Sequence, residues 1–161
     1  MKKFLALLLL AFPLAASAAE PGLSEEEKSW TEIEATLPPY PKEENLLPLF
    51  VSAATDNKFF VDAVSISVGE DGVVRYTIIV KSPAGADNVS FEGIRCATRE
   101  KKLYAFGRKD GSWSRAHVSK WEPIRYQDIN RHHHVLYDDF FCPNDLIVKN
   151  PQQAVELLRH R

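Results

Sequence analysis

Three consecutive histidines, His132, His133 and His134, are the side chains best suited to chemistry in this chain. If the segment around them is helical, Asp128 lies one turn from His132, and Asp138 lies one turn from His134. Imidazole and carboxylate ligands suit Zn²⁺ or Cu²⁺, so His132, His134, Asp128 and Asp138 form a candidate metal site. Adjacent histidines point in different directions, so no more than two of the three are expected to share one ion. The alternative is a surface histidine cluster that binds metal only adventitiously or responds to pH.

An aromatic and basic set is the second candidate and would bind a ligand. Its members are Trp113, Arg115, Trp121, Arg125 and Tyr126. Aromatic faces stack on sugars and arginine holds carboxylates or phosphates, so glycans, peptides or lipid head groups are the ligands expected. The alternative is that Trp113 or Trp121 anchors a core, with its indole N–H hydrogen-bonded inside the protein.

Glu92, in the run Glu92-Gly93-Ile94-Arg95-Cys96, is the third candidate. A glutamate in a cleft can act as a general acid or base, whereas a buried glutamate paired with an arginine is structural. Spacing identifies no second catalytic group, so the structural interpretation is favoured. The sequence also contains no nucleophile motif, phosphate loop or dinucleotide fingerprint. No catalytic residue is therefore assigned, and the balance is against an enzyme.

Cys96 and Cys142 are the two cysteines of the chain. In an oxidising compartment a lone pair most simply forms a disulfide, which here would tie the sheet to the C-terminal segment. A catalytic or redox thiol is the alternative, but the Cys-x-x-Cys spacing is absent.

Residues 1–18 have the pattern of a cleaved signal peptide: two lysines, a short apolar run, and then Ala16-Ser17-Ala18. The apolar run is shorter than the roughly 20 residues of a membrane-spanning helix. Export is therefore predicted, with the periplasm as the main destination and outer-membrane association as another possibility. The mature chain is expected to have no transmembrane span.

The elements that must position the candidate residues begin with an acidic leader. Residues 19–44 carry eight acidic residues against two lysines, whereas residues 45–161 have a net charge of +2. A capping box at Ser24 and the spacing of apolar residues predict a helix over 24–37, which a proline-rich connector then ends. Residues 45–161 are predicted to form a single domain. Its charge is too balanced to favour nucleic acid as a partner.

The domain is predicted to have an α+β fold, a five- or six-stranded antiparallel sheet with two or three flanking helices and one disulfide. The expected strands are 59–68, 73–81, 89–96, 102–108 and 112–118, with 46–53 as a further edge strand. Residues 59–68 alternate in polarity, which predicts one buried and one exposed face. Asn150 and Pro151 begin a helix that runs to residue 159, and residues 126–141 fit either a helix or a strand.

Several segments resemble the CNP-one-like family of uncharacterised secreted proteobacterial proteins. They are Asp71-Gly72-Val73-Val74-Arg75-Tyr76, the loop from Ser82 to Val89, the pentad from Glu92 to Cys96, Trp113, Trp121 and Phe141-Cys142-Pro143. The resemblance covers residues 25 to 145. It implies an exported envelope protein without an assigned activity or cofactor, and it supplies no catalytic residues.

The function predicted from the sequence is a non-catalytic binding or accessory module in the periplasm. Its partner would be an envelope protein, a peptide or a cell-wall component. The alternative is a metal-binding protein or a small metal-dependent hydrolase that uses the His132–His134 cluster.

Overall fold

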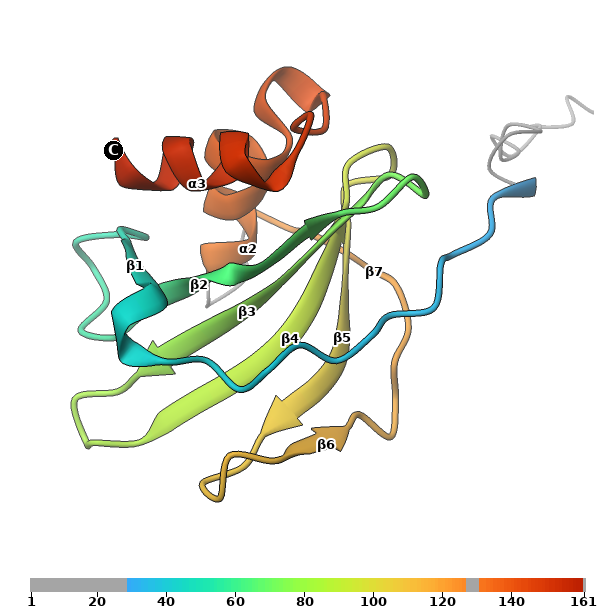
Figure 1. The fold of residues 1–161 in the computed structure, drawn as a ribbon. Helices are drawn as coiled ribbons and strands as arrows, with labels where there is room; N and C mark the ends of the chain where they lie inside the picture. The colour runs from blue at the N-terminus through green and yellow to red at the C-terminus, as the bar shows by residue number, and fades with distance from the viewer. Residues whose placement is uncertain (1–28, 127–130, 161) are drawn as a thin grey trace, which may run out of the picture. The chain divides into compact units, whose positions relative to one another are not determined.

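A single antiparallel sheet organises the described residues of the computed structural model, which are 29–126 and 131–160 (Figure 1). Each strand lies next to its neighbour in sequence, in the order β1 to β6, and β7 also pairs with β5. The strands are β1 (Leu46–Leu49), β2 (Lys58–Val68), β3 (Val73–Lys81), β4 (Asp87–Arg95), β5 (Glu100–Gly107), β6 (Trp113–Arg115) and β7 (Glu122–Pro123). The α+β prediction is confirmed, with the short β7 as an additional strand. The predicted signal peptide lies outside the described residues.

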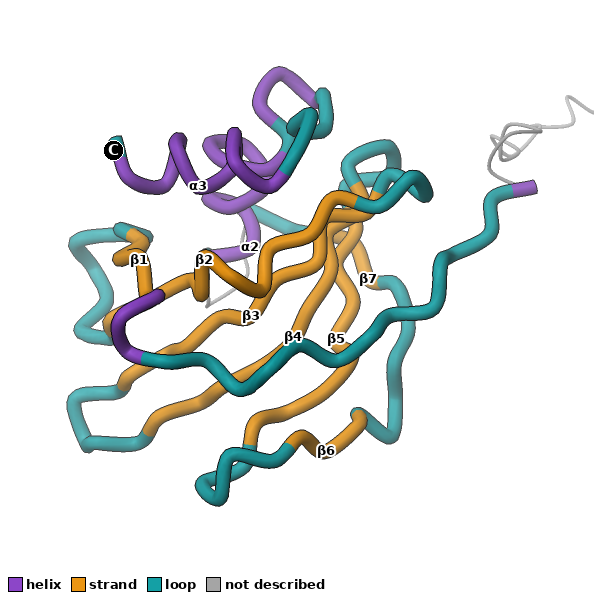
Figure 2. The backbone as a smooth tube through the Cα atoms, viewed as in Figure 1, coloured by secondary structure: helices purple, strands orange, loops and turns teal. Residues whose placement is uncertain are grey.

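The helices follow the sheet in sequence and lie together on one side of it (Figures 1 and 2). They are α2 (His132–Val135), a π-helical segment (Leu136–Phe141) and α3 (Pro151–Arg159), with 3₁₀ turns at Glu43–Asn45 and Pro143–Asp145. The α3 prediction is confirmed, because Asn150 Oδ1 accepts a hydrogen bond of 2.9 Å from the Gln153 amide. The ambiguous segment is helical from His132 to Phe141. Among the described residues, no helix has the length and apolar character needed to cross a membrane.

The main core lies between the sheet and these helices. Tyr76, Ile78 and Ile94 are fully buried on this side of the sheet. The Tyr76 ring packs against Phe141, with ring centroids 5.0 Å apart, and Leu136 fills the same layer. The β-branched and aromatic residues of β3 suit this position at the centre of the sheet.

The disulfide between Cys96 and Cys142 joins the two layers of this core, as predicted. Cys96 follows β4, and Cys142 follows the π-helical segment, 46 residues later. The Tyr137 hydroxyl reinforces the link because it donates a hydrogen bond of 2.9 Å to the Cys96 carbonyl.

The simple alternation predicted for β2 is wrong, because a bulge reverses it part of the way along. The β2–β3 register shifts between Asp62 and Ser67. Ser65 bridges the gap, since its hydroxyl donates to the Asp62 carbonyl and accepts from the Thr77 amide at 2.8 Å. Phe59 and Ile66, which differ in parity, therefore both enter the main core.

The opposite side of the sheet is covered by residues 31–42, called the strap below. In Figure 1 the strap runs in blue to cyan across the sheet, on the side away from α2 and α3. Ala35 and Leu37 pack on Phe91 and Tyr104 to form a second, smaller core. The strap is therefore built into the fold.

The helix predicted over residues 24–37 is wrong for residues 30–37, which have no helical turn, whereas Ser29 is helical. Its backbone groups bond to the sheet instead, and the Pro38 carbonyl accepts a hydrogen bond of 2.9 Å from the Trp113 indole. These long-range contacts replace the local hydrogen bonds that a helix would have made. Residues 24–28 lie outside the described residues.

Candidate functional site

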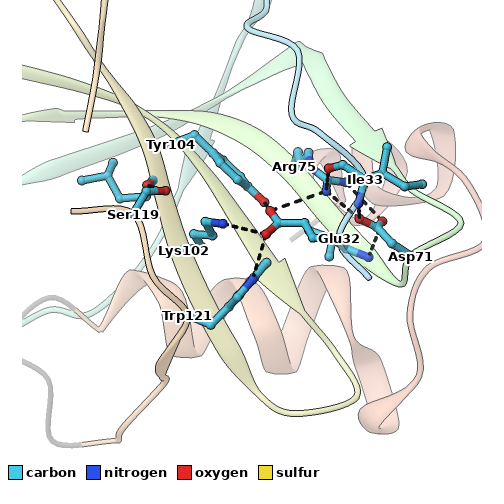
Figure 3. A network of polar contacts seen from close by, with 10 residues as sticks. Glu32, Ile33, Asp71, Arg75, Lys102, Tyr104, Ser119 and Trp121 are labelled. Carbon is cyan, nitrogen blue, oxygen red and sulfur yellow. Dashed lines mark hydrogen bonds and ion pairs between the residues drawn. The ribbon is translucent and has the colours of Figure 1, made fainter. Parts of the chain in front are cut away.

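A polar network on the strap side of the sheet is centred on Glu32 (Figure 3). Its carboxylate contacts Lys102 Nζ at 2.6 Å and accepts from the Tyr104 hydroxyl at 2.7 Å. The Trp121 indole N–H also donates to it, at 3.1 Å. One strap side chain is thus held by β5 and by the loop that follows β6.

Arg75 and Asp71 hold the next residue of the strap through its backbone. Arg75 Nη2 lies 2.6 Å from Asp71 Oδ2 and donates a hydrogen bond of 2.7 Å to the Ile33 carbonyl. Asp71 Oδ2 in turn accepts a hydrogen bond of 2.9 Å from the Ile33 amide. Both charged side chains are buried, with exposed fractions of 6% and 1%. Their arrangement fixes the strap in one position.

Both carboxylates of this side titrate below their usual range. Burial opposes ionisation of Glu32, but Lys102 and Tyr104 outweigh it and lower the pKa of Glu32. Burial also opposes ionisation of Asp71, and the Arg75 guanidinium outweighs it and lowers the pKa of Asp71. Both groups are therefore ionised at neutral pH.

Acid is expected to loosen the strap, because each carboxyl has a lower pKa in the folded chain than in the unfolded chain. Their contribution to stability is complete above about pH 4.5 and is lost as the pH falls through the folded pKa values. Tryptophan fluorescence between pH 6 and pH 2 would follow the change, since Trp113 and Trp121 both contact the strap. The Glu32→Gln variant should show a shallower acid transition. An unchanged transition in this variant would contradict the role of Glu32.

A second polar cluster is buried on the helix side of the sheet, around Glu92. His133 Nε2 lies 2.7 Å from the Glu92 carboxylate. Tyr76 and Ser90 donate hydrogen bonds of 3.0 and 2.6 Å to the same carboxylate. Burial alone would raise the pKa of Glu92, but the charge of His133 holds it well below its usual range. The partner of Glu92 is therefore a histidine, and not the arginine considered from the sequence.

The His132 ring completes this cluster without a hydrogen bond to any described residue. Its side chain is buried, and neither ring nitrogen has a partner among the described residues. The ring lies 3.9 Å from that of His133 and 5.4 Å from that of Phe59, measured between centroids. Burial and the charge of His133 lower the pKa of His132 to about 3. The imidazole is therefore neutral at pH 7 and has a lone pair available.

A cleft along the outer edge of β5 opens beside the Glu92 cluster, and we call it the β5 cleft. It consists of two cavities of 340 and 410 Å³ that share Lys101, Lys120 and Glu122. Glu92 and His133 line the inner cavity. The remaining lining residues are Lys102, Leu103, Val118, Trp121, Pro123 and Arg125. Four basic side chains and one tryptophan thus surround the cleft.

The structure separates the five residues predicted to bind a ligand. Trp121 and Arg125 line the β5 cleft, whereas Trp113 contacts the strap. Arg115 is exposed on β6. Tyr126 is exposed and stacks edge-on against His134 at 4.8 Å. The two indole N–H groups bond inside the protein, which was the alternative considered from the sequence.

The residues predicted to bind metal are also divided. His134 lies 2.9 Å from Asp138, one helical turn away, and Arg99 contacts both side chains. His132 belongs instead to the cluster with Glu92 and His133. Asp128 lies outside the described residues. Spacing along the sequence does not show that Glu92 lies next to histidines about 40 residues later.

Comparison with known proteins assigns the chain to a family. The model of the CNP1-like family matches residues 25–159. Among curated proteins, the "Cryptic neisserial protein 1" of Neisseria gonorrhoeae (strain ATCC 700825 / FA 1090) is 30% identical over 78 residues. That match covers 42% of this chain and 38% of the length of the relative. No solved structure matches the chain significantly. Since the family model covers most of the sequence, this protein belongs to the CNP1-like family.

Proposed function

We propose that this protein is exported to the cell envelope and acts there as a non-catalytic module that binds an anionic envelope component. The β5 cleft is the observation that supports this proposal. Its basic residues, Lys101, Lys102, Lys120 and Arg125, outnumber its acidic ones, Glu92 and Glu122. Glu92 is paired with His133 and Lys102 with Glu32, so the positive excess comes from Lys101, Lys120 and Arg125 against Glu122. The cleft therefore attracts carboxylate or phosphate groups of a glycan, peptide or lipid head group.

In the outer part of the cleft, a bound anion can replace Glu122 as the partner of Lys120. Lys120 lies 3.6 Å from Glu122, and both side chains are more than half exposed. An exposed pair of this kind contributes little to stability, so a bound anion can take over the lysine. Trp121 lies beside them with its indole fixed by Glu32, so its ring is held in place for stacking. A larger cavity of 560 Å³ lies near Tyr40 and the 82–88 loop, but it contains no tryptophan or histidine.

Removal of two charges from the cleft should weaken anion binding about tenfold, which corresponds to about 1.4 kcal/mol. The double variant Lys120→Ala/Arg125→Ala can be compared with the parent by calorimetric titration with an acidic oligosaccharide at a fixed salt concentration. Arg115→Ala is the matched control, because Arg115 is exposed on β6 and does not line the cleft. Equal affinities for all three proteins would contradict the proposal.

Export is tested separately, with the full-length chain expressed in a bacterium that has a periplasm. A periplasmic product whose mass corresponds to cleavage after Ala18 is the expected result. A product that keeps its first 18 residues in the cytosolic fraction would contradict export.

A metal-dependent function is the second candidate. One observation favours it: His132 is buried with both ring nitrogens unpartnered among the described residues. A hydrolase would also need the metal to hold a water molecule within the β5 cleft.

A further inference from the structure

We infer that Glu92, His132 and His133 form a site for a divalent transition-metal ion, with Zn²⁺ as the ion that best suits its ligands. One carboxylate oxygen and one nitrogen from each histidine all lie within 4.8 Å of one another. All three residues are buried. Two imidazoles and one carboxylate are a ligand set that proteins use for zinc with one position left open. This inference goes beyond anion binding and does not depend on it.

The strongest support is the cost of keeping His132 where it is. A buried polar atom without a hydrogen bond destabilises the folded state, and His132 has two such atoms among the described contacts. A leucine would fill a similar space beside Phe59 without this cost. A metal ion would give one of the two nitrogens a partner. A histidine at position 132 is therefore explained by coordination of a metal ion and not by packing alone.

The two adjacent histidines are also placed so that they can act together. Their rings lie 3.9 Å apart and are tilted by 39°, although neighbouring residues on a helix normally point apart. They lie at the start of α2, where the backbone enters the helix. A tetrahedral ion with bonds of about 2.1 Å needs ligand atoms about 3.4 Å apart. The 2.7 Å contact between His133 and Glu92 must therefore open slightly, and the His132 nitrogen must move closer to both. Side-chain rotation brings His132 into place, because no hydrogen bond to a described residue holds its ring.

The groups around these ligands support a metal site in two further ways. Tyr76 and Ser90 donate hydrogen bonds to the Glu92 carboxylate and so fix its orientation. The inner cavity of the β5 cleft reaches Glu92 and His133, which leaves room for a water molecule or an anion on the ion.

Lys101 Nζ lies 3.4 Å from His133 Nδ1, and its charge opposes a bound cation. This lysine is therefore expected to limit the affinity.

A zinc titration of the chelator-treated, untagged protein in competition with a chromophoric chelator tests the site. We expect one ion per chain with submicromolar affinity, and at least 100-fold weaker binding for His132→Leu. His134→Leu is the matched control and should change the affinity less than threefold, because His134 contacts Asp138 and Arg99 instead. Lys101→Met should bind zinc more tightly. Weak, non-stoichiometric binding by the parent, or unchanged binding by His132→Leu, would overturn the inference.

Nuclear magnetic resonance of the histidine rings gives an independent result on the unmodified protein. Zinc should shift the ring nitrogen signals of His132 and His133 and leave that of His134 in place. This measurement decides the matter even if His132→Leu fails to fold. Shifts at His134 in place of His132 would assign the ion to the His134–Asp138 pair and contradict the site inferred here.

Discussion

Replacement of both Cys96 and Cys142 by alanine is expected to lower the free energy of unfolding by about 4 kcal/mol. The disulfide closes a loop with a sequence separation of 46 residues, and its loss allows the unfolded chain many more conformations. Both cysteines are buried between the sheet and the π-helical segment, so the folded state also loses its covalent link between the two layers. Urea denaturation of the parent and the double variant would measure the difference.

Alanine is preferred to serine in this experiment because a buried hydroxyl would add a cost of its own. Reduction of the parent protein serves as the control, since it breaks the same bond without changing the sequence. The loss in free energy of unfolding should be the same for the double variant and the reduced parent to within about 1 kcal/mol. A loss below about 1 kcal/mol in both would mean that packing of Tyr76 on Phe141 holds the layers without the bridge.

The second large effect is expected for Arg75→Met, which should destabilise the protein by about 3 to 5 kcal/mol. The substitution leaves the buried Asp71 carboxylate without its guanidinium partner at 2.6 Å. It also removes the hydrogen bond to the Ile33 carbonyl, which holds the strap on the sheet. We therefore expect a lower urea midpoint and faster proteolytic cleavage within the strap.

Lys81→Met is the matched control for this change, because it removes a positive charge from the same strand. Lys81 pairs with Glu43, whose side chain is 81% exposed, so we expect little change in the urea midpoint. The double variant Arg75→Met/Asp71→Asn should recover part of the loss, since it also removes the buried negative charge of Asp71. Equal destabilisation by Arg75→Met and Lys81→Met would show that burial of the Arg75–Asp71 pair has no special importance.

The strands could be predicted because their pattern is local. Residues 73–81 are rich in β-branched and aromatic side chains, and Gly72 before them has a positive φ of 75° that suits a tight turn. The reversal of parity in β2 could not be predicted, because it depends on a hydrogen bond between Ser65 and the backbone of β3. The strap was missed for a similar reason. Its sequence fits a helix, but the contacts that decide its conformation come from distant strands.

The candidate sites show the same division between local and distant information. Spacing of one helical turn predicted the contact between His134 and Asp138, and the structure contains it. The pairing of Glu92 with His133 joins β4 to α2 across 41 residues, and only the fold brings these side chains together. Adjacent histidines were expected to point in different directions, yet the rings of His132 and His133 lie side by side. The spacing of residues along one sequence does not reveal which distant side chains the fold brings together.

The strap also has a consequence for the order in which the chain can fold during synthesis. Glu32 is made early, but its partners Lys102, Tyr104 and Trp121 follow 70, 72 and 89 residues later. Strands β2 to β4 are joined by short turns and can pair long before that. A nascent chain that ends before β5 therefore lacks Lys102 and Tyr104, which hold Glu32, although the strap that will cover Phe91 already exists. The strap is made before the sheet, yet its contacts through Glu32 are completed only after β5 and Trp121 have been made, and until then the half-made sheet is open to chaperones and to aggregation.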